Sequence, residues 1–200
     1  MRTATPSKSS SFLSSKWASR FLQSAIIQGA VITFLTVLFI SIQLLLSSSI
    51  NIVQFLSLSF EGPAKWIFLG YIFYMILIVS IATTSVFYNH FEVNMQRIIR
   101  GFRSVLAWVH LIGMNVGGAT VTLTMIYAGL VGSGIMGIIM SGGNNAVELK
   151  PNTQVLEQFI IPISIFAAIL VIGLIAGGLT FLLSFFLGDM KRAEHKLQQA

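Results

Sequence analysis

The sequence predicts an all-α integral membrane protein, a bundle of four transmembrane helices with both termini in the cytoplasm. Only 9% of its 200 residues are charged and 55% are hydrophobic. The charged residues leave four long uncharged runs, at residues 21–60, 66–91, 104–147 and 158–188. The twelve Lys and Arg residues fall before, between and after these runs in the order four, one, three, one, three. A soluble domain of this size cannot bury so much apolar surface, and basic residues concentrate in cytoplasmic loops, so this pattern predicts both the fold class and its orientation.

Each uncharged run contains a stretch long enough to cross a bilayer, since an α-helix needs about 20 predominantly apolar residues to span the hydrocarbon core. The four stretches cover residues 21–46, 66–88, 105–131 and 159–187. Short connections and the lack of an internal repeat predict a single transmembrane domain over residues 21–188. We expect a flexible, basic, Ser-rich cytoplasmic tail at residues 1–20 and a charged cytoplasmic tail at residues 189–200.

The first element follows a segment that resembles a targeting peptide in composition. Residues 1–20 contain seven serines and no acidic residue. The apolar run that follows is too long for the core of a signal peptide, so we expect a retained tail. After the first helix, residues 50–60 mix apolar and polar side chains and predict a short segment at the outer membrane interface.

The second helix carries four hydroxyl side chains in its inner half, namely Ser80, Thr83, Thr84 and Ser85. Hydroxyls in helices commonly donate to a carbonyl of their own helix, and we expect the same here. Lining of a conduction path is the less favoured alternative.

The third and fourth helices each carry a G-x-x-x-G pair, formed by Gly113 with Gly117 and by Gly173 with Gly177. Small residues at this spacing let a second helix approach closely. They predict packing faces, used either within the bundle or toward a partner. The glycine-rich residues 132–152 predict an external loop, preceded by a loosely wound extension of the third helix through Ile139.

His110 is the one ionisable side chain expected well inside a membrane span. A polar side chain at this depth usually has a partner, and an interhelical hydrogen bond is favoured over contact with a quinone, a lipid or a neighbouring subunit. One histidine cannot form a two-histidine haem site or a histidine-rich metal site. All six acidic residues lie at or beyond the helix ends, and the chain has no cysteine. We therefore expect no metal, cofactor or catalytic residues of its own and no enzymatic activity.

Arg97, Arg100 and Arg103 recur at every third position between the second and third helices. In helical geometry this spacing spreads the cations over one cytoplasmic face, where they would contact phospholipid headgroups. The formal net charge of +6 does not predict nucleic-acid binding, because the cations lie at helix ends without an aromatic stacking surface beside them.

Residues 87–93 form an aromatic-rich helix end, a short basic linker follows, and the next helix leads from His110 to Gly113 and Asn115. With Tyr88, this outline within residues 71–131 resembles the late helices of subunit I of the haem-copper oxygen reductases. That family carries paired haem-ligating histidines in the preceding helix, whereas residues 71–86 contain none, and the copper ligands are missing too. The resemblance implies an accessory or degenerate subunit of a respiratory oxidase, archaeal oxidases included, with haem and copper in partner subunits.

The favoured function is therefore a non-catalytic plasma-membrane subunit of a multi-subunit respiratory oxidase or related redox complex. It would pack through its third and fourth helices against cofactor-bearing subunits, contact phospholipids and form part of a quinone-side wall. The alternative is a small homo-oligomeric transporter or permease component, for which the missing membrane-depth carboxylates disfavour ion-coupled transport but not passive conduction. A four-helix redox enzyme of the cytochrome b kind would need ligands that the sequence lacks.

Overall fold

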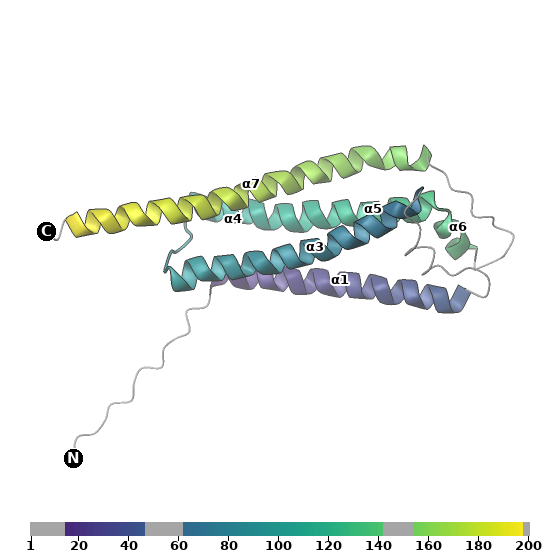
Figure 1. Cartoon of the computed structure of the whole chain (residues 1–200), viewed down its shortest axis with the longest axis horizontal. Coiled ribbons are helices and arrows are strands. Elements are labelled where there is room, and N and C mark those ends of the chain that lie inside the picture. The colour runs from purple at the N-terminus through teal and green to yellow at the C-terminus, as the bar shows by residue number, and fades with distance from the viewer. Residues whose placement is uncertain (1–14, 47–61, 142–153, 198–200) are drawn as a thin grey trace, which may run out of the picture.

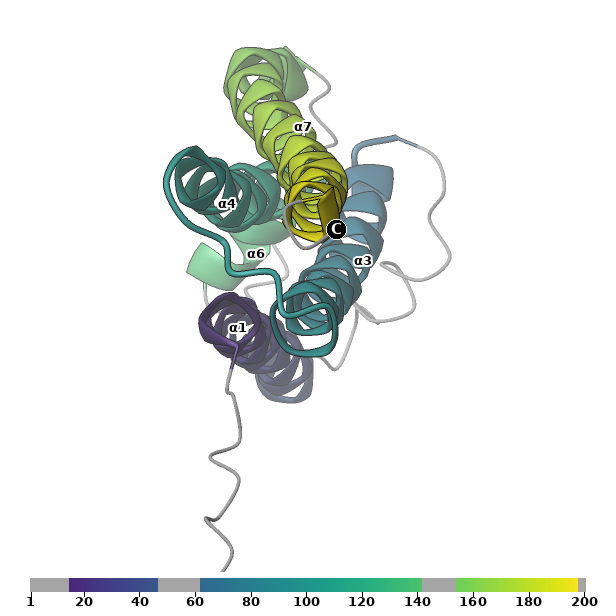
Figure 2. The same ribbon diagram turned by 90° about the vertical axis from the view of Figure 1, so that its left-hand side faces the viewer.

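The computed structural model describes residues 15–46, 62–141 and 154–197, and every element in these ranges is helical. Four stretches are long and apolar enough to cross a membrane: Lys16–Ile42, Ala64–Asn94, Phe102–Gly132 and Leu156–Phe186. They form an elongated bundle in which successive spans run in opposite directions (Figures 1 and 2). The predicted all-helical fold is confirmed for the described residues, as is the presence of four helices long and apolar enough to span a membrane. The expected interfacial segment at 50–60 and most of the expected external loop lie outside the described residues.

The first helix, α1, covers Lys16–Leu46 and begins earlier than the predicted start at residue 21. The Oγ of Ser15 accepts a hydrogen bond from the backbone N–H of Ala18 at 3.0 Å, as a helix N-cap does. Trp17 in the first turn is buried because its indole packs against Tyr88 and Trp108. Residues 16–20 therefore belong to the bundle and not to the predicted flexible tail.

The second helix, α3, covers Ala64–Asn89 and continues into a π-helical turn, η1, at His90–Asn94. Pro63 occupies its N-cap, where a missing backbone N–H leaves no helical hydrogen bond unmade. The third span joins three elements in one continuous rod: α4 at Phe102–Ile112, a π-helical segment η2 at Gly113–Gly118, and α5 at Ala119–Gly132.

A short helix, α6, follows the third span at Ile135–Met140, where the sequence predicted a loosely wound extension. Gly134 separates it from α5 with a φ of 81°, a conformation that glycine adopts without steric strain. The last helix, α7, covers Gln154–Leu197 and is longer at both ends than the predicted 159–187. Most of the predicted charged tail is therefore a continuation of this helix.

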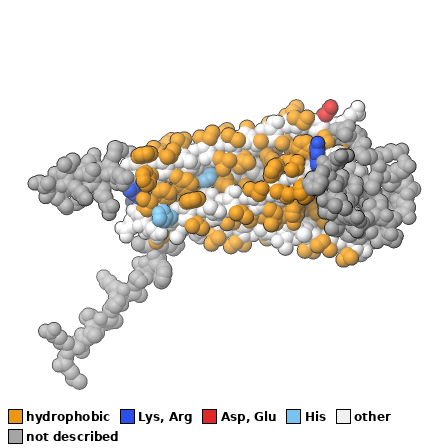
Figure 3. Space-filling view, viewed as in Figure 1, with side chains coloured by type: hydrophobic (Ala, Val, Ile, Leu, Met, Phe, Trp, Pro, Cys, Tyr) orange, Lys and Arg blue, Asp and Glu red, His pale blue; other side chains and the backbone are white. Residues whose placement is uncertain are grey.

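The third span forms the centre of the bundle. Inside its most apolar window 56% of the residues are buried, against 33% for α3 and 11% each for α1 and α7. Helix α3 packs against α1 and α5, while α7 packs against α4, η2 and α5. Hydrophobic side chains cover the flank of the bundle between its two ends (Figure 3). The outer faces of α1 and α7 are thus apolar, and none of the described residues covers them.

Candidate functional site

One ring from each of the four spans meets at the same level of the bundle. Phe21 of α1, Tyr88 of α3, His110 of α4 and Phe181 of α7 make up this ring cluster. Phe21 stacks on Tyr88 with centroids 4.8 Å apart, and Phe181 lies 5.0 Å from Tyr88. His110 lies 5.1 Å from Phe21 and 6.1 Å from Phe181. Because ring pairs in this range add about 0.5–1.5 kcal/mol beyond burial, the cluster ties all four spans together.

His110 is enclosed by the bundle and is only 3% exposed. Its Nδ1 shares a hydrogen bond with the hydroxyl of Tyr88 at 3.3 Å, which links α4 to α3. A β-carbon on Gly177 of α7 would overlap the imidazole, so the ring lies directly on the backbone of that helix. His110 thus makes the interhelical hydrogen bond that the sequence favoured. Its ring has no face open to a quinone, a lipid or a partner subunit.

The glycine pairs of the third and fourth spans lie in the contact between these spans, where Gly113 meets Gly173. A β-carbon on Gly113 would lie 2.5 Å from the α-carbon of Gly173, and one on Gly117 would lie 2.6 Å from the backbone nitrogen of Leu170. Real β-carbons essentially never make a non-bonded contact under 3.0 Å with an atom of another helix, so this contact requires glycine. The chain itself uses these faces. Of the two uses that the sequence left open for these faces, the structure shows packing within the bundle.

A second close seam, between α3 and α5, was not predicted. A β-carbon on Gly70 would lie 2.7 Å from the carbonyl oxygen of Thr122, and one on Gly129 would lie 2.6 Å from the backbone nitrogen of Ile67. Neither glycine belongs to the two pairs singled out in the sequence. The available signal was an isolated glycine in a long apolar helix, which alone does not identify the helix it faces.

The hydroxyls of the second span serve packing. Ser80 Oγ donates to the carbonyl of Ile76 and Thr84 Oγ1 to that of Ser80, both at 2.8 Å, as expected for hydroxyls in a helix. Ser85 Oγ instead donates to the carbonyl of Ala18 at 2.9 Å and ties α3 to α1. An open cavity of about 250 Å³ adjoins Ser80, but its walls are mainly apolar side chains of α3, η2, α5 and α7. These contacts give no polar path along α3.

A ladder of polar side chains joins three spans at a deeper level than the ring cluster. The Tyr74 hydroxyl donates to Gln28 Oε1, and Gln28 Nε2 donates to Asn115 Oδ1 at 3.1 Å. Asn115 Nδ2 in turn donates to the carbonyl of Leu111 at 2.8 Å. The sequence singled out Asn115 only for its place in the family outline. Gln28, an amide inside the apolar run of the first span, was the missed signal.

The predicted helical row of arginines is wrong. Residues 96–100 are not helical, and Gln96 and Gly101 have φ values of 51° and 60° that turn the chain before α4. The spacing of Arg97 and Arg100 therefore does not place them on one helix face with Arg103.

Two of these three arginines bond to backbone carbonyls. Arg97 Nη1 donates to the carbonyl oxygens of Ser184 at 3.1 Å and Phe185 at 2.8 Å. Arg103 Nη2 donates to the carbonyl oxygen of Ile98 at 3.2 Å. Arg97 thereby fastens the connection to α7, while Arg100 lies exposed at the rim of a cavity.

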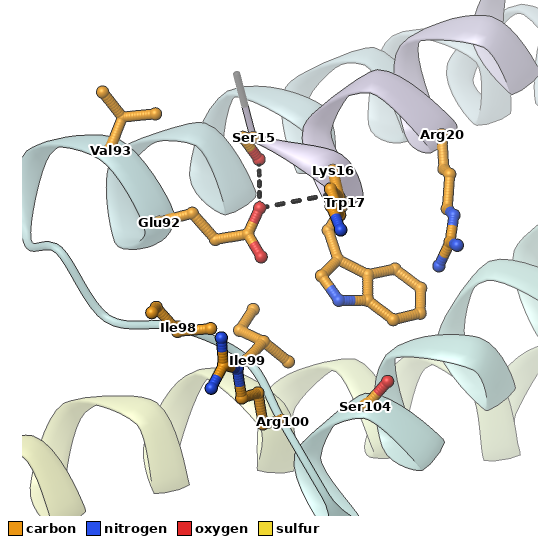
Figure 4. A pocket seen from close by; sticks show the side chains of 10 residues that line it. All are labelled: Ser15, Lys16, Trp17, Arg20, Glu92, Val93, Ile98, Ile99, Arg100 and Ser104. Carbon is orange, nitrogen blue, oxygen red and sulfur yellow. Dashed lines mark hydrogen bonds between the residues drawn. The ribbon is translucent and has the colours of Figure 1, made fainter. Parts of the chain in front are cut away.

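Glu92 holds the start of α1, a role that the sequence did not reveal. Its Oε2 accepts hydrogen bonds from Ser15 Oγ at 2.5 Å and from the backbone N–H of Trp17 at 3.3 Å (Figure 4). An acidic group there also interacts favourably with the positive end of the helix dipole. Glu92 and Ser15 are 77 positions apart, so sequence spacing gave no sign of the pairing.

Arg20 departs from the expectation that the basic residues lack aromatic surface. Its guanidinium carbon lies 4.7 Å from the ring centroid of Trp17 and 4.7 Å from that of Trp108. Both contacts are within the range of cation–π attraction. An open cavity of about 400 Å³ lies beside this cluster and between α1, η1 and the start of α4 (Figure 4).

In the part of the chain that the structure describes, no group of three or more His, Asp or Glu side chains lies close enough together to hold a metal ion. Comparison with known proteins finds no matching family model, no matching curated protein and no matching solved structure.

Proposed function

We propose that the chain is a non-catalytic membrane subunit of a multi-subunit respiratory oxidase or related redox complex. In this proposal haem and copper belong to partner subunits, and the chain supplies scaffold and lipid contact in the plasma membrane. Both termini would face the cytoplasm, as the distribution of basic residues favours. The redox assignment draws on the resemblance of residues 71–131 to late helices of oxygen reductase subunit I.

The observation that carries the proposal is the use of the interior polar groups. His110 is bonded to Tyr88 and covered by Gly177, and Gln28 and Asn115 are bonded to each other. Each of these contacts joins different spans. The chemistry of the interior therefore serves to hold the helices in place, as suits a structural subunit.

The outer surface supplies the faces on which partner subunits would pack. Phe34 of α1 and Ile161 of α7 are each 70% exposed, and similar side chains continue along both helices. These faces suit lipid chains and apolar partner helices alike. Since the glycine faces are occupied within the chain, we propose α1 and α7 as the surfaces that meet cofactor-bearing subunits.

Co-purification tests the proposal. The tagged chain, expressed in its native host, would be extracted in a mild detergent and its associated proteins identified by mass spectrometry. We expect haem-bearing oxidase subunits in fixed proportion to the chain. A homo-oligomer without such subunits would contradict the proposal and favour the transporter alternative.

A further inference from the structure

The 400 Å³ cavity at the start of α1 has an excess of positive charge. Three cations line it, Lys16, Arg20 and Arg100, together with one carboxylate, that of Glu92. Arg20 and Arg100 reach it from opposite sides, one from α1 and the other from the connection before α4 (Figure 4). Cations from two segments that are distant in sequence thus converge on one open space.

Glu92 offsets only one of these three positive charges. Its Oε2 is engaged by Ser15 and by the backbone N–H of Trp17. Within the described ranges, no hydrogen bond or ion pair engages the charged groups of Lys16, Arg20 or Arg100. As far as the described residues go, their N–H donors are open to an anion that enters the cavity.

The contact with two indoles holds the guanidinium of Arg20 in an orientation suited to anion binding. Cation–π contact uses the faces of the planar guanidinium, and its N–H edges are the groups that bind phosphate oxygens. Ser104, whose hydroxyl also lines the cavity, adds a further donor.

The depth of the cavity indicates where the anion comes from. Lys16 is the first residue of a membrane span, and Phe102, two residues after Arg100, is the first residue of another. Trp17 and Trp108 lie beside the cavity, as expected for the aromatic belt at the level of the lipid headgroups. We propose that this cavity binds a phosphate group, and that the headgroup of an anionic phospholipid supplies it.

Tryptophan quenching by brominated lipids tests this site in the full chain. A Trp66→Phe substitution leaves Trp17 and Trp108 as the reporters, since the chain has three tryptophans. The protein would be reconstituted in bilayers in which brominated phosphatidylglycerol or brominated phosphatidylcholine replaces increasing amounts of unlabelled phosphatidylcholine. We expect phosphatidylglycerol to be preferred, with about a fivefold loss of that preference in Arg100→Gln, because each surface cation contributes about 1 kcal/mol to anionic lipid binding.

Arg100→Gln is the main variant because Arg100 does not contact the reporter rings, and Arg20→Gln tests the other side of the cavity. Lys65→Gln is the matched control, since it removes one exposed cation at the opposite end of α3. It should leave the preference unchanged. Equal quenching by the two lipids would contradict the proposed site. So would an equal preference for phosphatidylglycerol in the parent protein and in Arg100→Gln.

Inorganic phosphate at millimolar concentration distinguishes the two sources of the anion. If the lipid occupies the cavity, phosphate should leave the quenching by brominated phosphatidylglycerol unchanged. Displacement of the lipid signal by phosphate would overturn the lipid assignment and identify soluble phosphate as the ligand.

Discussion

At the scale of single residues, Gly177 and Gly178 are neighbours on α7 with opposite surroundings. A β-carbon on Gly177 would overlap the His110 imidazole, whereas one on Gly178 would meet none of the described atoms within 4 Å beyond the adjacent backbone of α7. The site of contact between α4 and α7 therefore depends on one of these glycines and not on the other.

Alanine substitution should separate the two positions. We expect Gly177→Ala to lower the free energy of unfolding by about 1–3 kcal/mol, because the added methyl group must displace the imidazole or the helix. Gly178→Ala should be neutral or stabilise by up to about 1 kcal/mol, since alanine favours helix more than glycine does. Reversible unfolding in mixed detergent micelles measures both, and equal losses in the two variants would contradict the packing described here.

The Tyr88 hydroxyl gives a second test at this scale. Tyr88→Phe keeps the ring stacked on Phe21 and removes the hydroxyl, which bonds to His110 and also to Thr180. We expect a loss of about 0.6–2 kcal/mol in the free energy of unfolding, the range for one interhelical bond and for a buried acceptor left unpaired. Tyr127→Phe, at a position that is half exposed, is the control and should have little effect. A Tyr88→Phe variant as stable as this control would show that the hydroxyl contributes nothing to stability.

At the scale of elements, the start of α1 depends on a residue at the end of the second span. Glu92 accepts hydrogen bonds from Ser15 and from the first turn of α1, so removing its carboxylate should loosen that turn. We expect Glu92→Ala to speed amide hydrogen exchange in residues 16–20 about fivefold, for a loss of about 1 kcal/mol. Hydrogen exchange followed by mass spectrometry measures it. Glu157→Ala, in the exposed first turn of α7, is the control and should leave the exchange rates of these amides unchanged. An equal effect of the two variants would contradict the role of Glu92 at the start of α1.

The helix boundaries also show what the sequence could and could not predict. The spans themselves were predictable, because membrane crossing requires long uncharged apolar runs and the chain has four. The start of α1 was not, because it is set by contacts of Ser15 and Trp17 with residues from two other spans. The prediction of a helical row of arginines was wrong for a local reason. It assumed one continuous helix, and the turn at Gly101 interrupts that helix.

The sequence predicted which residues belong to the candidate site but not which of them contact each other. The sequence singled out His110, Gly113, Gly117, Gly173 and Gly177, and the structure brings them all to the contact between the third span and α7. Which residue lies against which depends on the rotation of each helix about its axis, and the π-helical segment at Gly113–Gly118 alters that rotation within the third span. The ring cluster combines one side chain from each span, a coincidence of four rotations that no local pattern encodes.

At the scale of the whole molecule, the orientation in the membrane is the first prediction to test. The order of basic residues predicts that the connection between η1 and α4 is cytoplasmic and that the start of α3 is external. The chain has no cysteine, so Gln96→Cys and Lys65→Cys each introduce a single thiol without background. In intact cells a membrane-impermeant maleimide should label the cysteine at 65 and not the one at 96. The reverse pattern would invert the topology.

The assembly is the second question at this scale. Among the described residues, helices α1 and α7 present long uncovered apolar faces, while His110, Gln28 and Asn115 in the interior make hydrogen bonds between spans. The central claim is that such a chain holds no redox cofactor itself and packs against subunits that do. This claim separates the molecule from a redox enzyme and from a transporter that works as a homo-oligomer.

The most direct test is the visible absorption spectrum of the chain in two preparations, normalised to the amount of chain. Extracted from its native membrane in mild detergent, the chain should elute with an assembly that shows the Soret band of haem in fixed stoichiometry. Expressed and purified alone, it should fold and show no Soret band. A haem-free homo-oligomer from the native membrane, or stoichiometric haem bound to the isolated chain, would contradict the account.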